Sequence, residues 1–285
     1  MGIDLHQHLW PEQLVRALER RSEPPRLRGG RLELAVEGTF EVDLREHELD
    51  TRIELLDRHE LDVALVSLAP TMETDPHADL VDAYHEGIVE VVRTSRGRIV
   101  ALSAGEPRAG FAGVCISSHA LLAGCDPLYG ALEHDGGLLF VHPGPPGTRV
   151  PAHAPAWWTA AVEYTAQMQA AYLAWLSRDA ARFPTVAVVF AMLAGGAPIQ
   201  LERLRSRGVE VRSTLHPNGF FETSSYGRRA LELCLSTYGV TQVVFGSDAP
   251  VIDPGQTLAA VRAFGEAVTD IVVRQTPGRL LGEVR

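Results

Sequence analysis

The chain has 285 residues, 46% of them apolar, which suffices for the core of one large α/β domain. A formal net charge of −10 argues against nucleic acid or an anionic membrane surface as the main partner, and no apolar run approaches the ~18 residues that cross a bilayer. All 26 basic residues are arginines, which excludes a Schiff-base lysine and a carboxylated lysine bridging two metals. The three cysteines are widely spaced, so we expect reduced thiols in a cytoplasmic protein.

Eight short apolar runs of strand length alternate with amphipathic, helix-like segments. The predicted strands are 3–8, 62–68, 98–105, 113–118, 138–142, 185–193, 220–225 and 242–248, and the clearest helices are 52–59, 80–92 and 228–238. This alternation is typical of a parallel sheet covered by helices, and eight such units predict a (β/α)8 TIM barrel. An open doubly wound sheet is the alternative, but the Gly-rich signature that usually follows its first strand is missing.

We expect one domain over residues 1–285, and two further segments stand out. Residues 21–46 are rich in proline and glycine and form an insertion that either folds over the barrel mouth or is a plain surface loop. Residues 156–182 place aromatic side chains, from Trp157 to Trp175, at spacings of three and four, as on one face of a long helix. We expect that face to pack on the barrel or across a homodimer.

Four candidate metal ligands lie at the ends of predicted strands. His6 and His8 end the first strand, and residues i and i+2 of a strand point to the same side. His142 ends the fifth strand and Asp248 the eighth. Because the carboxyl ends of all strands meet at one rim of a parallel barrel, the four side chains are predicted to hold one divalent ion, Zn²⁺ first and Mn²⁺ second.

The segments DLHQH, FVHPG, FAMLAGGAP, FETSSYG and FGSDAP, in this order, resemble the amidohydrolase superfamily. The closest similarity is to the branch that includes aminocarboxymuconate-semialdehyde decarboxylase and metal-dependent hydrolases. The resemblance covers nearly the whole chain. It implies a (β/α)8 fold and a catalytic divalent metal, with His6, His8, His142 and Asp248 at the metal site. It also gives Asp248 a second role as the group that takes a proton from water.

One position departs from that family. Its members commonly carry a histidine at the end of strand 6, where this chain has Met192. A thioether cannot transfer protons and binds borderline metal ions poorly, so we expect a single ion. Asp248 or another histidine must then be the base: the candidates are His119, which we prefer, His153 and His216.

Other residues are candidates for contacts with a small-molecule substrate. Arg149 can pair with a carboxylate, and Ser224 can donate a hydrogen bond. Met192 and His216 complete the predicted substrate-binding set. The remaining histidines fall in helical or polar segments and are predicted to face solvent: His47, His59, His77, His85 and His134.

Three functions remain open from the sequence. The first is a metal-dependent hydrolase in which metal-activated water attacks an amide, a lactone or a related carbonyl. The alternative is a non-oxidative decarboxylase of a small aromatic or unsaturated acid, as in part of the resembled branch. The third is a metal-binding protein with weakened catalysis, for which Met192 is the reason.

Overall fold

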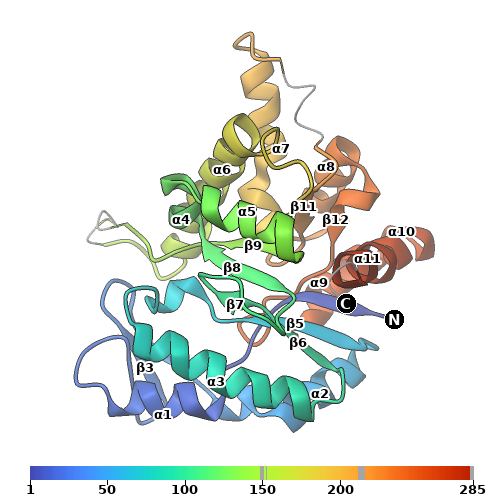
Figure 1. Ribbon diagram of the computed structural model, residues 1–285. Coiled ribbons are helices and arrows are strands. Elements are labelled where there is room, and N and C mark those ends of the chain that lie inside the picture. The colour runs from blue at the N-terminus through green and yellow to red at the C-terminus, as the bar shows by residue number, and fades with distance from the viewer. Residues whose placement is uncertain (148–150, 152, 211–215, 283–285) are drawn as a thin grey trace.

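The computed structural model describes residues 1–147, 151, 153–210 and 216–282 (Figure 1). Parallel strands form its centre, in one sheet of order β1-β5-β6 and another of order β12-β11-β10-β9-β8-β7. Their bounds are Ile3–His8 (β1), Val63–Ser67 (β5), Ile99–Ala101 (β6), Ser103–Ala104 (β7), Gly113–Ser117 (β8), Leu138–His142 (β9), Ala187–Phe190 (β10), Gly219–Glu222 (β11) and Val243–Val244 (β12).

Backbone hydrogen bonds join the two sheets into a ring. Leu5 donates to the Phe245 carbonyl at 2.9 Å, which ties β1 to the chain that follows β12. At the other seam Leu102 alone separates β6 from β7, and its N–H bonds to Val66 of β5 at 2.9 Å. Since β6 and β7 are two parts of one strand, the three and six strands of the two sheets make eight. The predicted (β/α)8 barrel is therefore confirmed.

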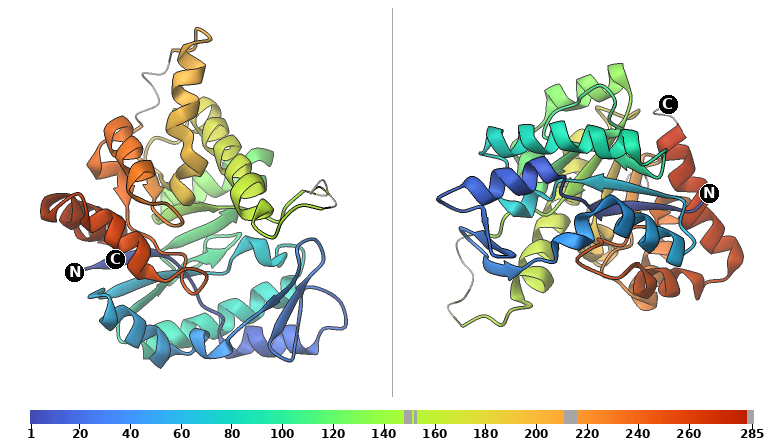
Figure 2. Two further views of the ribbon diagram at one scale, coloured as in Figure 1. Left: turned by 180° about the vertical axis from the view of Figure 1, so that it is seen from behind. Right: turned by 90° about the horizontal axis from the view of Figure 1, so that it is seen from below.

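Helices pack around the strands, as Figures 1 and 2 show. Leu80, Tyr84 and Ile88 are fully buried on one side of α3, because side chains four residues apart share a helix face. The helices are Glu12–Arg20 (α1), Leu49–Arg58 (α2), Ala78–Thr94 (α3), Ser118–Ala123 (α4), Asp126–Asp135 (α5), Tyr164–Ala174 (α6), Met192–Arg205 (α7), Arg228–Tyr238 (α8), Pro254–Arg262 (α9), Glu266–Asp270 (α10) and Thr276–Gly282 (α11). None of the described helices combines the length and the apolar character that a membrane crossing requires.

A small antiparallel sheet lies between α1 and α2, within the segment that the sequence marks as an insertion. Its strands are Arg26–Arg28 (β2), Arg31–Leu34 (β3) and Gly38–Glu41 (β4), in the order β2-β3-β4. Leu27, Leu32 and Leu34 are buried against the rest of the protein, whereas all four residues of β4 are exposed. One face of this sheet is therefore attached to the barrel.

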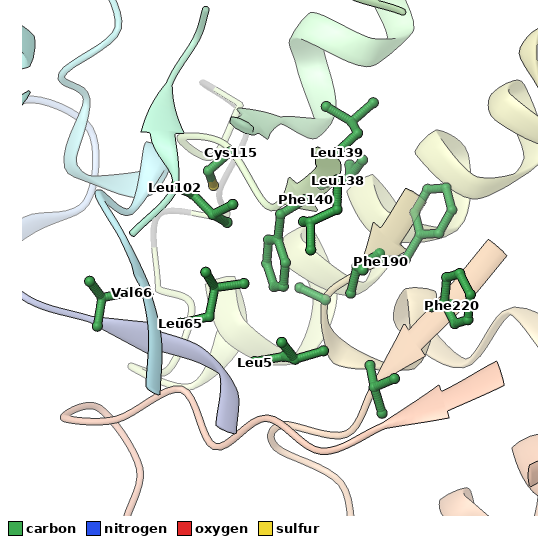
Figure 3. Close-up of a cluster of buried hydrophobic side chains, with 14 of the residues drawn as sticks. Leu5, Leu65, Val66, Leu102, Cys115, Leu138, Leu139, Phe140, Phe190 and Phe220 are labelled. Carbon is green, nitrogen blue, oxygen red and sulfur yellow. The ribbon is translucent and has the colours of Figure 1, made fainter. Parts of the chain in front are cut away.

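Apolar side chains fill the interior of the ring. Figure 3 shows Leu5, Leu65 and Phe140 directed toward one another between the strands. All three are at most 1% exposed. In the register of β8 with β9, Cys115 is opposite Phe140 and Ser117 is opposite His142. Alternation along β9 therefore places His142 on the same side as Phe140, one layer closer to the carboxyl end.

The long aromatic segment divides into a buried and an exposed part. Its regular centre is α6, which π-helical turns precede at Thr159–Glu163 and follow at Trp175–Asp179. Trp175 is 2% exposed and contacts Phe190 edge-to-face, with 5.3 Å between ring centroids. Trp157 is 61% exposed. The buried part packs on the barrel, which is one of the two expected outcomes for this face.

Replacement of Trp175 by alanine is expected to lower the free energy of unfolding by about 3–5 kcal/mol, because it leaves a cavity against Phe190. The matched control is Trp157→Ala, which removes an exposed indole and should change stability by no more than about 0.5 kcal/mol. Urea unfolding followed by circular dichroism measures both. Equal losses in the two variants would contradict the assignment of Trp175 to the core.

Candidate metal centre

Four side chains with metal-binding atoms converge at the carboxyl ends of the strands. His6 and His8 come from β1, His142 from β9 and Asp248 from the chain after β12, and one ligand atom of each lies within 4.8 Å of the others. His8 Nε2 is 3.2 Å from His6 Nε2 and 3.1 Å from Asp248 Oδ1. Two ligands at about 2.1 Å from a tetrahedral Zn²⁺ ion are about 3.4 Å apart, so this spacing suits one ion.

The outer nitrogens of two imidazoles are bound to backbone carbonyls. His8 Nδ1 is 3.1 Å from the carbonyl oxygen of Ser67, and His142 Nδ1 is 2.9 Å from that of Pro143. Because a carbonyl oxygen only accepts hydrogen bonds, each Nδ1 must carry the proton. The Nε2 atoms are then unprotonated in the neutral ring and present a lone pair to the centre.

A buried carboxylate holds the third imidazole. Glu222, the last residue of β11, is 0% exposed, and its Oε2 lies 2.8 Å from His6 Nδ1. The same carboxylate accepts from the Ser224 hydroxyl at 2.7 Å and from the Met192 N–H at 3.2 Å. A Cβ at Gly246 would overlap this carboxylate, so the position requires glycine. A carboxylate on the outer nitrogen of a metal-binding histidine fixes the ring and makes it a stronger ligand.

The donor set fits a divalent cation. Three Nε2 lone pairs and one carboxylate oxygen face one another at short distance, and such an arrangement is repulsive without a positive charge at its centre. One proton on His6 satisfies only part of this group, whereas a divalent ion binds all four atoms. Three imidazoles with one carboxylate are nitrogen and oxygen ligands of the kind that Zn²⁺ accepts.

Burial and neighbouring charges shift the pKa values of the side chains at the centre. Burial by itself would lower the pKa of His6, but the carboxylates of Glu222 and Asp248 outweigh it and raise that pKa to about 9. Burial and the neighbouring His8 and His6 hold the pKa of His142 well below its usual value. Burial would raise the pKa of Asp248, but the three imidazoles lower it. The metal-free centre therefore keeps a proton on His6 at neutral pH.

A buried polar network supports β1 beneath the histidines. Asp4 accepts hydrogen bonds from the Ser247 hydroxyl at 2.6 Å and from Gln7 Nε2 at 2.7 Å. Arg52, which is 1% exposed, donates to Gln7 Oε1 at 2.7 Å and to the Ala249 carbonyl at 3.2 Å. Burial raises the pKa of Asp4 to about 6. These bonds fix the two chain segments that carry His6, His8 and Asp248 relative to each other.

Two residues predicted to contact substrate are hydrogen-bonded to Glu222, on the outer side of His6. Ser224 is 0% exposed, and its hydroxyl lies 3.3 Å from His6 Nδ1 and donates to Glu222. The enclosed hydroxyl is thus bonded within the protein, on the outer side of His6. Met192 is partly buried at the end of β10. Met192 begins a turn that runs to Gly196, and every residue of this turn has positive φ. The contact of Met192 with the centre is the hydrogen bond from its backbone N–H to Glu222.

The other predicted site residues lie outside the four-residue group. His119 is an exposed residue of α4, close to Gly144 in the loop after β9. His153 is exposed in the same loop, and Arg149 lies outside the described residues. His216 precedes β11 and packs edge-to-face on Trp175, 5.4 Å between ring centroids. It lies at the amino end of its strand, whereas the four ligands lie at carboxyl ends.

Two histidines predicted to face solvent are buried. His47 is 8% exposed and stacks on Trp10, with 4.4 Å between ring centroids. Its Nδ1 accepts a hydrogen bond from the backbone N–H of Trp10. His85 is 4% exposed and accepts from the N–H of Ala104 at 3.0 Å. Burial lowers the pKa of His47 to about 3 and that of His85 to about 4. Both act as neutral hydrogen-bond acceptors.

No family model and no curated protein matches the chain. Among solved structures, it is similar to apo IDCase from Metarhizium anisopliae (TM-score 0.83, 18% identity, 100% of this chain and 98% of that one). It is also similar to an amidohydrolase II (TM-score 0.78, 15% identity, 99% and 100%). A third is a dihydroxybenzoic acid decarboxylase from Polaromonas sp. JS666, with bound manganese and the inhibitor 2-nitroresorcinol (TM-score 0.70, 14% identity, 100% and 97%). At these identities the likeness shows the fold alone, a (β/α)8 barrel.

Replacement of Glu222 by glutamine is expected to weaken Zn²⁺ binding about 10- to 100-fold, because His6 loses the carboxylate that orients it. Competition with a chromogenic chelator gives the dissociation constant. Glu232→Gln, on the exposed side of α8, is the control and should bind Zn²⁺ like the wild type. Unchanged affinity in the Glu222 variant would show that His6 does not depend on it.

The stability of the metal-free protein is expected to fall as the pH rises from about 6.5 to about 9. The pKa of His6 is higher in the folded protein than its ordinary value of 6.5, so its proton stabilises the fold fully below pH 6.5 and is lost through pH 9. Thermal unfolding between pH 6 and 10 measures this. The Zn²⁺-loaded protein, whose His6 carries the ion, should not share the decline. If the thermal unfolding midpoint of the metal-free protein stays level or rises over this range, the raised pKa assigned to His6 is disproved.

Proposed function

We propose that the chain is a divalent-metal-dependent hydrolase of the amidohydrolase superfamily that acts on a carbonyl group of a small molecule, such as an amide or a lactone. The observation that carries the proposal is the convergence of three imidazole Nε2 atoms and one carboxylate at the carboxyl rim of a barrel. This rim is where (β/α)8 enzymes place their catalytic groups. Zn²⁺ is the ion that we assign first, with Mn²⁺ second.

The side chains of the centre have different roles in the proposed reaction. A bound divalent ion supplies a Lewis acid and lowers the pKa of water. His6, His8 and His142 orient that ion, because their outer nitrogens are fixed by Glu222 and by backbone carbonyls. The side chain of Asp248 is 17% exposed, against 1% for His6 and 5% for His8. It is the ligand most open to a substrate, so we assign it the proton transfer to the leaving group.

Decarboxylation of a small aromatic or unsaturated acid is the second candidate. It is supported by the fold similarity to a manganese-containing dihydroxybenzoic acid decarboxylase. Asp248 would then transfer a proton to the carbon from which carbon dioxide leaves. Fold similarity does not determine chemistry, so the two reactions have to be separated by their products. A cytoplasmic location and a homodimer stay predictions from the sequence.

The test is a His142→Ala variant, with His134→Ala, whose side chain is 87% exposed, as the control. Metal analysis should find about one Zn²⁺ per wild-type chain and per control chain, and little in the His142 variant. Turnover is measured on a panel of amides and lactones, and of hydroxybenzoates with detection of carbon dioxide. Activity should be absent from the His142 variant alone.

The results separate the readings. Release of an amine or alcohol supports the hydrolase, and oxygen-independent release of carbon dioxide supports the decarboxylase. Full metal content with no turnover on any substrate supports the third reading from the sequence, a metal-binding protein with weakened catalysis. Full occupancy and unchanged turnover in the His142 variant would refute the metal centre itself.

A further inference from the structure

We propose that Gln167 is a positioning residue of the metal centre. Its side-chain amide fixes the peptide group between Pro143 and Gly144, and that peptide group holds the imidazole of His142 in the orientation that binds the ion. The inference rests on the metal centre of the proposed function and adds to it a residue of α6, which supplies none of the four ligands. Loss of the amide is therefore expected to weaken metal binding although every ligand is still present.

One peptide group connects the ligand to Gln167. The carbonyl oxygen of Pro143 accepts a hydrogen bond from His142 Nδ1 at 2.9 Å, and the N–H of Gly144 donates to Gln167 Oε1 at 2.8 Å. This carbonyl and this N–H belong to the same planar unit, and in a trans peptide they point in opposite directions. The histidine and the glutamine thus bind the two ends of one rigid group. Rotation of that group would break both hydrogen bonds together.

The sequence of this loop leaves few other ways to fix the peptide group. Residues 143–146 read Pro-Gly-Pro-Pro, and proline has no N–H, so Gly144 carries the one backbone donor among them. Gly144 is buried, and a Cβ at this position would lie 2.9 Å from His119 Nδ1 and 3.1 Å from Ser117 Cβ, which favours glycine. Because glycine rotates more freely than other residues, the constraint has to come from outside the loop. The bond to Gln167 supplies it.

Gln167 is enclosed and uses both ends of its amide. It is 9% exposed, and its Nε2 donates to the Pro145 carbonyl at 3.2 Å. Its Oε1 also accepts from the Ser118 hydroxyl of α4 at 2.9 Å. Since the N–H of Gly144 can only donate and the carbonyl of Pro145 can only accept, the amide has one orientation. Figure 1 shows α6 beside α4 near the end of β9, where these helices contact each other. Two bonds to neighbouring residues fix the loop to α6.

The effect of this amide on the metal follows from what the Pro143 carbonyl does for His142. An acceptor on the outer nitrogen fixes the tautomer and the direction of a metal-binding imidazole, and such acceptors change metal affinity. Without Gln167 the peptide group is free to rotate, its carbonyl leaves Nδ1, and the ring loses both constraints. His6 and His8 keep theirs, because their outer nitrogens have partners elsewhere. The centre should therefore bind metal more weakly but not lose it.

The test uses the full-length protein with Gln167→Met, which keeps the length of the side chain and removes the amide. Two controls separate positioning from a general loss of stability. Ser118→Ala removes the other bond to Gln167 Oε1 and leaves both bonds to the loop. Gln242→Met removes an amide that donates to the His216 carbonyl at 2.8 Å, at the amino end of β12. For each protein we measure the Zn²⁺ dissociation constant by chelator competition, the visible spectrum of the Co²⁺-substituted form, and the thermal unfolding midpoint without metal.

Gln167→Met should bind Zn²⁺ about tenfold more weakly and show altered Co²⁺ bands, because His142 is no longer held. Both controls should match the wild type in affinity and spectrum, even where their unfolding midpoints fall by as much. If Gln167→Met does not fold, Gln167→Asn replaces it with the same expectation, since its shorter amide does not reach both loop residues. Unchanged affinity, an unchanged spectrum, or equal losses in a control would overturn this inference and leave the metal centre standing. Failure of the wild type to bind Zn²⁺ would overturn the proposed function itself.

Discussion

The centre depends on which nitrogen of each imidazole carries the proton. Backbone carbonyls fix Nδ1–H on His8 and His142, and the buried Glu222 takes Nδ1 of His6. The inner nitrogens of His8 and His142 are thereby left to face Asp248 with their lone pairs, and that of His6 joins them when it gives up its second proton. A free imidazole chooses between two tautomers, whereas these three rings have no such choice. The folding free energy offsets the repulsion between these ligand atoms in the metal-free protein. The ion then binds to a preformed set of ligands.

That arrangement in turn requires the ring of strands to close at one particular seam. Backbone hydrogen bonds from Leu5, His8 and Asp248 join β1 to the chain after β12. Asp4, Ser247 and Arg52 add buried side-chain bonds at the same seam. Asp248 adopts positive φ, which aspartate tolerates better than most residues, and its N–H bonds to the His6 carbonyl at 2.8 Å. The carboxylate is thus placed by the same strand that supplies two of the histidines.

The sequence predicts the parts that follow from periodicity and leaves out the parts that follow from tertiary contacts. Eight apolar runs specify the barrel, and the ends of three of them place His6, His8, His142 and Asp248 at one rim. Glu222 is missed, although a carboxylate at the end of the apolar run FFE is a signal that could have revealed it. Burial of His47 and His85 depends on Trp10 and on the edge of β7, which no local pattern encodes. His216 precedes its strand, whereas the four ligands lie at or after the carboxyl ends of theirs.

The most direct test of this account is a crystal structure of the Zn²⁺-loaded protein with anomalous diffraction measured on both sides of the zinc absorption edge. The account predicts one peak per chain, about 2.0–2.2 Å from Nε2 of His6, His8 and His142 and from one carboxylate oxygen of Asp248. No peak at the rim, a second ion of equal strength, or binding through a different set of side chains would contradict it.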